Sequence, residues 1–231
     1  MSTDDGGRVA IKGILKRSLP VTLASGLIPL SGLLDSILSV RLMTGYAANA
    51  VSLYGLFSGG AVTIINLPVS VCYGLAAASI PAVAGETESG RRRKKKVVFA
   101  LLITLLVSIP CAVGLYLFAP MIVGILFRSL QEIEKQTLVE LVKVFSISAV
   151  TLSATQTLSA CLTAQGKPQY AALSMLIAIT VKTAAYVLLL RNPEISVFGM
   201  AHATNLCYLV AFSLNLLYNF TCKRNKERKS E

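Results

Sequence analysis

Long apolar stretches, separated by short polar or charged segments, dominate the chain. Each stretch is about 20 residues or longer, the length that an α-helix needs to cross roughly 30 Å of hydrocarbon. Strands of a membrane barrel would give short segments of alternating polarity instead. We therefore predict an all-α membrane protein with a bundle of six transmembrane helices, and we expect residues 120–127 to form a short interfacial piece. The predicted spans cover residues 19–41, 53–83, 97–119, 138–163, 169–190 and 195–219.

The composition supports this prediction. Hydrophobic residues make up 54% of the chain and charged residues 14%, and the mean hydropathy is +0.67. Soluble domains are nearer to a quarter charged. A chain this apolar is expected to be a multi-pass protein of the cell membrane, surrounded by membrane lipid.

The formal net charge is +11, but the basic residues are clustered in alternate loops. The run RRRKKK at residues 91–96 lies between two predicted spans, and residues 223–229 follow the last span. Basic loops stay on the cytoplasmic side, so this pattern is an orientation signal and argues against a nucleic-acid partner. With an even number of spans, both termini are predicted to be cytoplasmic. The chain then divides into a basic N-terminal segment (1–17), a transmembrane lobe (18–220) and a basic tail (221–231).

The second predicted span has a proline at its centre, in the stretch TIINLPVSVCYG over residues 63–74. Pro68 removes the hydrogen bond to the carbonyl of Ile64, and membrane helices tolerate this loss because neighbouring groups satisfy the carbonyl. Gly59 and Gly60 allow the close approach of another helix. We predict a helix kinked at Pro68, which either lines a cavity or serves packing alone.

Three ionisable residues lie inside predicted spans at a similar depth, about 9–12 Å from the outer end at 1.5 Å per residue. They are Asp35, Lys182 and His202, and Asn205 lies one turn deeper than His202. Intramembrane charges are by default functional and paired. We expect Asp35 and Lys182 to pair, either to fix packing or to bind an anionic substrate. His202 and Asn205 are candidates for ion coupling or packing.

The sequence contains no motif typical of an enzyme. It has one histidine, and neither a G-x-S-x-G nor an H-E-x-x-H motif. The cysteines lack the spacing of a metal site, so we expect neither a metal nor a cofactor. We interpret them as small apolar residues; they are Cys72, Cys111, Cys161, Cys207 and Cys222.

Three stretches resemble prokaryotic oligosaccharide-lipid flippases, whose superfamily includes the lipid II flippase and the MATE drug exporters. The stretch LYGLFSGGAVTIINLPVSVCYGLAAASIPAVAGE, over residues 53–86, resembles a signature segment of the second lobe of these proteins. Residues 19–43 are similar to the seventh helix of the family, and residues 158–190 to the tenth and eleventh. Stage V sporulation protein B-like members look most similar.

The resemblance covers helices seven to twelve of about fourteen family helices, and alternating access in such transporters needs two repeats. It implies that this chain is a fragment, one part of a split protein, or a subunit that pairs with a second six-helix lobe. That lobe would be a separate chain or a missing N-terminal half; a homodimer is the less favoured arrangement. The resemblance also places Asp35, Arg41 and Asn66 near the substrate path. Some relatives bind a coupling cation where the Lys182 ammonium would lie.

The function implied by the resemblance is translocation of a lipid-linked, pyrophosphate-bearing oligosaccharide for cell-wall or polysaccharide assembly. One alternative is a lobe of a drug or cation exporter of the same superfamily, because a cationic drug needs acidic groups in the cavity. Another alternative is a truncated chain that inserts into the membrane but transports nothing. An upstream reading frame with about six more spans would favour a split transporter.

Overall fold

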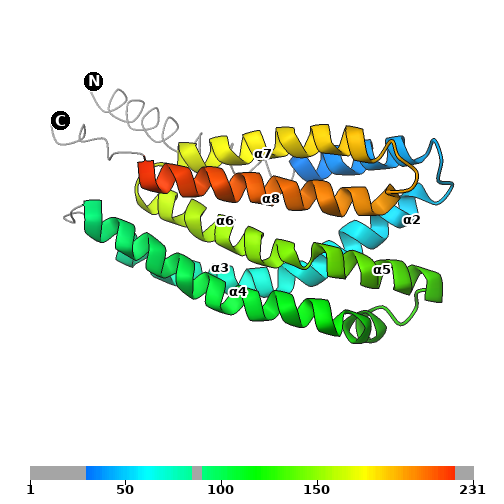
Figure 1. The fold of residues 1–231 in the computed structure, drawn as a ribbon, viewed down its shortest axis with the longest axis horizontal. Helices are drawn as coiled ribbons and strands as arrows, with labels where there is room; N and C mark the ends of the chain where they lie inside the picture. The colour runs from blue at the N-terminus through cyan, green and yellow to red at the C-terminus, as the bar shows by residue number, and fades with distance from the viewer. Residues whose placement is uncertain (1–29, 85–89, 222–231) are drawn as a thin grey trace, which may run out of the picture.

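The computed structural model describes residues 30–84 and 90–221, which form helices lying side by side in an elongated bundle (Figure 1). Within these ranges the structure has no strand. The first described helix covers residues 30–43. The helices that follow are α2 (Ala50–Gly55), the π-helix η1 (Leu56–Ala61), α3 (Val62–Ala84), α4 (Gly90–Leu126), α5 (Glu132–Phe145), α6 (Ile147–Ala164), α7 (Pro168–Leu189) and α8 (Ser196–Thr221).

The all-helical membrane architecture predicted from the sequence is confirmed, but the number of spans is not settled. Four described helical stretches are long and apolar enough to cross a membrane, and the number rises to five if α5 and α6 form one bent span. The first predicted span begins outside the described residues. The N-terminal segment and nearly all of the basic tail also lie outside them, so that six spans and the domain boundaries stay predictions.

The second span is confirmed as one helical stretch, but it changes its type of turn. Residues Leu56–Ala61 form a π-helix between α2 and α3. Short π-helical segments are uncommon and frequently occur at functional sites. Helix α3 then continues through Pro68, and the predicted kink at this residue stays a prediction.

Helix α4 corrects two predictions about the third span. It begins at Gly90, so the basic run at 91–96 forms the start of a helix rather than a loop. It also continues through Pro110 and Pro120 to Leu126, so the apolar piece at 120–127 is nearly all part of the same helix. At 37 residues, α4 is about 55 Å long. In Figure 1 its last turns are seen almost end-on, which shows that the helix changes direction near this end.

The fourth predicted span, residues 138–163, is divided between two helices, so that a single crossing of the membrane by this segment stays a prediction. Helices α5 and α6 meet at Ser146 with a bend of 45°. At this point the amide of Ser146 donates to the carbonyl of Lys143, and the amide of Ala149 to that of Ser146. These shorter-range bonds replace the regular ladder of an α-helix.

Helix α5 is amphipathic and not apolar on all sides. Its inner face consists of the buried residues Leu138, Leu141, Val142 and Phe145. Glu132 and Glu140 on the opposite face are exposed. Such an apolar stripe is typical of a helix that packs on a core with its other face in water or among lipid headgroups.

The largest apolar core lies where η1, α3, α5 and α8 meet. Its fully or almost fully buried members include Phe57, Ile64, Leu138, Phe145 and Met200. The rings of Phe57 and Phe145 lie 5.3 Å apart between centroids. This core fixes α5 and α3 against α8 and therefore fixes the position of the residues considered below.

Helix connections alternate between the two ends of the bundle. The start of α4, the α6–α7 connection and the end of α8 lie at one end, and the α4–α5 and α7–α8 connections lie at the opposite end, whereas α5 passes into α6 within the bundle (Figure 1). The first end carries residues 92–96 and Lys167. This separation fits the orientation predicted from the sequence, although the side of the membrane on which each end lies stays a prediction.

Candidate functional site

The two charged residues expected to pair are in contact. The Lys182 Nζ atom lies 2.7 Å from Asp35 Oδ2 and donates a second hydrogen bond of 2.6 Å to Ser31 Oγ. The exposed fraction is 7% for the lysine side chain and 17% for the aspartate. A buried ammonium with two oxygen partners is compensated in charge and in hydrogen bonding.

The ion pair connects the first described helix to α7, and aromatic and hydroxyl groups continue the site towards α8. Tyr186 lies one turn after Lys182, and its ring centroid is 5.8 Å from the ammonium nitrogen. The hydroxyl of buried Tyr186 is 3.2 Å from Thr204 Oγ1 on α8. The first described helix and the consecutive helices α7 and α8 therefore meet at one polar cluster, which we name the Asp35–Lys182 site.

The sequence placed Asn205 one helical turn from His202, but the two side chains have different surroundings. His202 is exposed on α8. Asn205 is partly buried; it accepts a hydrogen bond from Ser148 Oγ and donates one of 3.0 Å to the backbone carbonyl of Val144. Asn205 thus joins α8 to the α5–α6 bend, which supports the packing alternative. An ion-coupling role for either residue stays a prediction.

Arg41 and Asn66 are both exposed. Arg41 lies six residues after Asp35 on the first described helix, about 9 Å further along its axis. Asn66 belongs to a row of small and polar residues that recurs every three or four positions and is exposed throughout, which we name the polar stripe. Its members are Ser52, Gly55, Gly59, Thr63, Asn66 and Ser70.

The exposed surface of α4 has a different character. Its exposed large residues are apolar over most of its length, as expected for a helix that contacts lipid. They include Phe99, Leu102, Leu106, Ile109, Val113, Leu117 and Met121. The polar stripe and the α4 surface therefore fit two different neighbours.

Sequence reasoning missed the buried asparagines near the end of α8. Asn215 Nδ2 donates to Ser159 Oγ of α6 at 2.7 Å, and its Oδ1 accepts from Ser174 Oγ of α7 at 2.5 Å. Asn219 Nδ2 donates to the carbonyl of Leu158 at 3.0 Å. Polar side chains at helix interfaces are typical of membrane bundles. The sequence feature that could have indicated these contacts is the pair of asparagines four residues apart in an apolar span.

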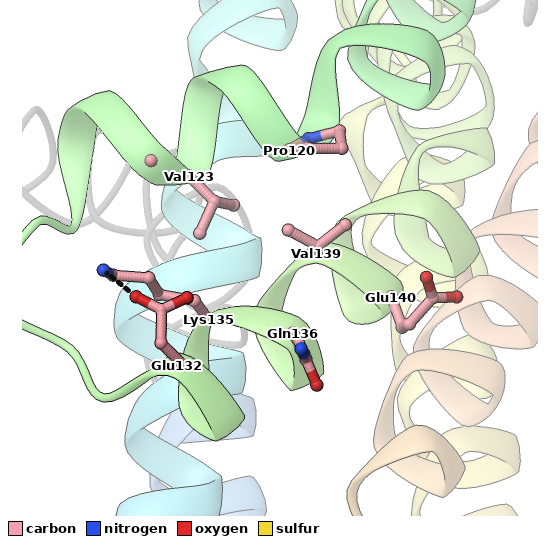
Figure 2. A pocket seen from close by; sticks show the side chains of 8 residues that line it. Pro120, Val123, Glu132, Lys135, Gln136, Val139 and Glu140 are labelled. Carbon is pink, nitrogen blue, oxygen red and sulfur yellow. Dashed lines mark hydrogen bonds and ion pairs between the residues drawn. The ribbon is translucent and has the colours of Figure 1, made fainter.

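A groove between α4 and α5 was also not predicted. It has a volume of about 560 Å³, and Figure 2 shows the side chains that line it. Val123 and Val139 face each other across it, and Lys135 is paired with Glu132 at 2.7 Å. The sequence prediction divided the lining residues between the interfacial piece, a loop and the start of the fourth span, so it gave no reason to place them together.

The described residues contain no group of three or more histidine, cysteine or acidic side chains that would hold a metal ion. The Asp35–Lys182 site itself offers an ammonium, a carboxylate and the hydroxyl groups of Ser31, Tyr186 and Thr204. Such a site can bind opposite charge, or hold two helices together until a competing charge separates them.

The comparisons with known proteins agree with this architecture. The sequence matches the family described as lipid II flippase MurJ over residues 6–230. Among solved structures, a MOP superfamily transporter from Pyrococcus furiosus, described as having a binding pocket of reverse polarity, has a TM-score of 0.72 and 18% sequence identity. At this identity the likeness shows the fold.

The structural match covers 91% of this chain and 45% of the transporter's chain. This chain therefore spans less than half the length of that solved relative. The search of curated proteins finds no significant match. Because the family match extends over almost the whole sequence, this chain belongs to the lipid II flippase MurJ family, whose members are transporters and not enzymes.

Proposed function

We propose that this chain forms one lobe of a flippase that moves a lipid-linked, pyrophosphate-bearing oligosaccharide across the cell membrane by alternating access. The observation that carries the proposal is the family match over residues 6–230. Transport by alternating access requires movement of one repeat against another around a central site. The solved relative has about as much chain again beyond the matched part, which supports a second lobe as the partner.

The polar stripe of α2, η1 and α3 is the surface proposed to face this second lobe and the substrate path. Exposed hydroxyl and amide groups such as Thr63 and Asn66 would lose hydrogen bonds to water in contact with lipid tails. Opposite another lobe they line a hydrated passage. The apolar surface of α4 is the corresponding lipid-facing side.

The charges available for a pyrophosphate are Arg41 and Lys182. Arg41 is exposed, and a guanidinium binds phosphate oxygens in a bidentate manner. Lys182 is held by Asp35 and Ser31, so that it reaches an anionic substrate only if the first described helix separates from α7. In this mechanism the substrate phosphate replaces the Asp35 carboxylate as the partner of the ammonium.

The carboxylate of Asp35 favours a second candidate function, export of a cationic drug by the same kind of lobe. In that case the cation would compete with Lys182 for Asp35. The two functions require opposite charges on the substrate, so that a transport assay with both substrate classes separates them.

The test begins with co-purification of the full chain in mild detergent, where a second membrane lobe is expected to be recovered with it. The reconstituted pair is expected to flip a fluorescent lipid-linked oligosaccharide in liposomes. Lys182→Met and the Asp35→Asn/Lys182→Met double variant are expected to lose at least tenfold in rate, whereas Arg191→Met at the α7–α8 connection keeps it. Transport of a cationic dye without flipping of the lipid-linked oligosaccharide would overturn the flippase function. An unchanged rate of flipping in both Lys182 variants would overturn the role of Lys182 in binding the substrate.

A further inference from the structure

The start of α4 combines two features that sequence analysis treated separately. Lys94 and Lys95 belong to the basic run, and Val98, Phe99 and Leu102 belong to the apolar span that follows. The structure places all five around one shallow groove of about 440 Å³. Because the run is helical from Gly90 onward, residues spaced by four and eight lie on one face.

All five residues lining this groove are exposed. The exposed fraction is 64% for Phe99 and 59% for Leu102, which is high for large apolar side chains at the surface of a bundle. Lys94 Nζ also lies 5.9 Å from the ring centroid of Phe220, near the end of α8. This contact holds one cation beside the groove at the junction of two helices.

From Lys94 to Leu102 the helix rises about 12 Å. Over this distance the lining changes from two ammonium groups to three hydrocarbon side chains. A phospholipid has the same order of groups along the membrane normal, with its phosphate near the surface and its acyl chains below. Juxtamembrane lysines attract anionic headgroups, each contributing on the scale of a few-fold in binding.

We propose that this groove is a binding site for an anionic phospholipid. The headgroup phosphate binds Lys94 and Lys95, and one acyl chain lies along Val98, Phe99 and Leu102. The site lies on the lipid-facing helix α4, so the bound lipid is a resident ligand and not the transported substrate. The inference depends on insertion into a membrane and not on the proposed transport function.

The chain offers a direct measurement because it contains no tryptophan. The variant Phe99→Trp places a single fluorescent reporter in the groove of the full chain. After reconstitution into phosphatidylcholine vesicles, dibrominated phosphatidylglycerol and dibrominated phosphatidylcholine quench this reporter on contact. We expect the phosphatidylglycerol to bind beside the reporter about tenfold more strongly, with the preference decreasing as salt is raised.

The lysines are tested in the same Phe99→Trp background. Lys94→Gln/Lys95→Gln is expected to reduce the preference to about twofold or less, and the charge-retaining Lys94→Arg/Lys95→Arg to keep it. The matched control, Arg128→Gln/Arg191→Gln, removes the same net charge at the opposite end of the bundle and is expected to change nothing. Circular dichroism and gel filtration of every variant check that it is folded.

Equal quenching by the two brominated lipids would overturn the proposal. So would an unchanged preference in folded Lys94→Gln/Lys95→Gln, or an equal loss in the Arg128→Gln/Arg191→Gln control. Displacement of the brominated lipid by a stoichiometric amount of a polyprenyl pyrophosphate would assign the groove to a transport substrate instead. If the unmodified chain, reconstituted with its second lobe, does not flip the lipid-linked oligosaccharide while the Phe99→Trp chain still prefers phosphatidylglycerol, the proposed function is contradicted and this site is supported.

Discussion

The Asp35–Lys182 site is the most informative feature at the scale of single residues. Removing two charges from water is costly, and their attraction repays the cost only when the geometry is good and further hydrogen bonds are made. Ser31 supplies such a bond to the ammonium. Loss of one partner leaves a buried charge uncompensated, whereas loss of both does not.

We therefore predict that Lys182→Met lowers the free energy of unfolding by about 3–5 kcal/mol, and that adding Asp35→Asn restores most of this loss. The control is Lys143→Met, which breaks the more exposed pair with Glu140 and should cost less than about 1 kcal/mol. Thermal or denaturant unfolding of the purified chain in detergent provides the measurement. A double variant as unstable as Lys182→Met would contradict this account.

The sequence predicted this pair because charges are rare in apolar spans, and two of opposite sign were expected to find each other. It could not place His202, because the direction in which a side chain points depends on how its helix is rotated in the bundle. The exposed position of His202 and the buried contacts of Asn215 follow from how α8 packs against α6 and α7. The groove at Lys94 was missed for a different reason, because the basic run was predicted to be a loop and is in fact helical from Gly90 onward.

At the scale of helices, apolar length and polarity were sufficient to predict the type of element but not its bends. Residues around Ser146 include neither proline nor glycine, so nothing local indicated the break between α5 and α6. The hydrogen bond from Asn205 to the freed carbonyl of Val144 comes from another helix. A bend stabilised in this way cannot be recognised from the segment that bends.

The adjacent glycines of η1 give a prediction at this scale, because they have different surroundings. A Cβ atom at Gly60 would lie 2.6 Å from a methyl carbon of Leu138, whereas at Gly59 nothing lies within 4 Å. We predict that Gly60→Ala destabilises the chain by about 1–3 kcal/mol through overpacking. Gly59→Ala should be neutral, or stabilising by up to about 1 kcal/mol.

Unfolding of the two glycine variants under identical detergent conditions gives the comparison. An equal effect of the two substitutions would show that η1 does not pack on α5 as described. Gly59→Ala also changes the polar stripe, so its rate of flipping in the reconstituted pair reports on that surface separately from stability.

At the scale of the whole molecule, the two ends of the bundle differ in their charges. The described end near the start of α4 carries residues 92–96, and the opposite end carries both signs, including Glu132 and Arg128. The asymmetry of basic loops determines orientation in membranes. The mixed end is therefore expected outside the cell.

Cysteine labelling in intact cells tests this orientation. In a background where the five native cysteines are replaced by alanine, we predict that a membrane-impermeant maleimide modifies Ser129→Cys and not Arg92→Cys. Both positions are exposed. Opening the cells should make Arg92→Cys reactive, which controls for accessibility. Labelling of Arg92→Cys alone in intact cells would reverse the orientation.

The contact between Asp35 and Lys182 joins positions 147 residues apart, and this separation has a consequence for biogenesis. At a translation rate of about 5–20 residues per second, the first helix emerges from the ribosome on the order of 10 s before its lysine partner is synthesised. During that interval the carboxylate has no ammonium to neutralise it. The nascent helix must therefore stay beside the insertion machinery, or in a hydrated part of it, until α7 arrives.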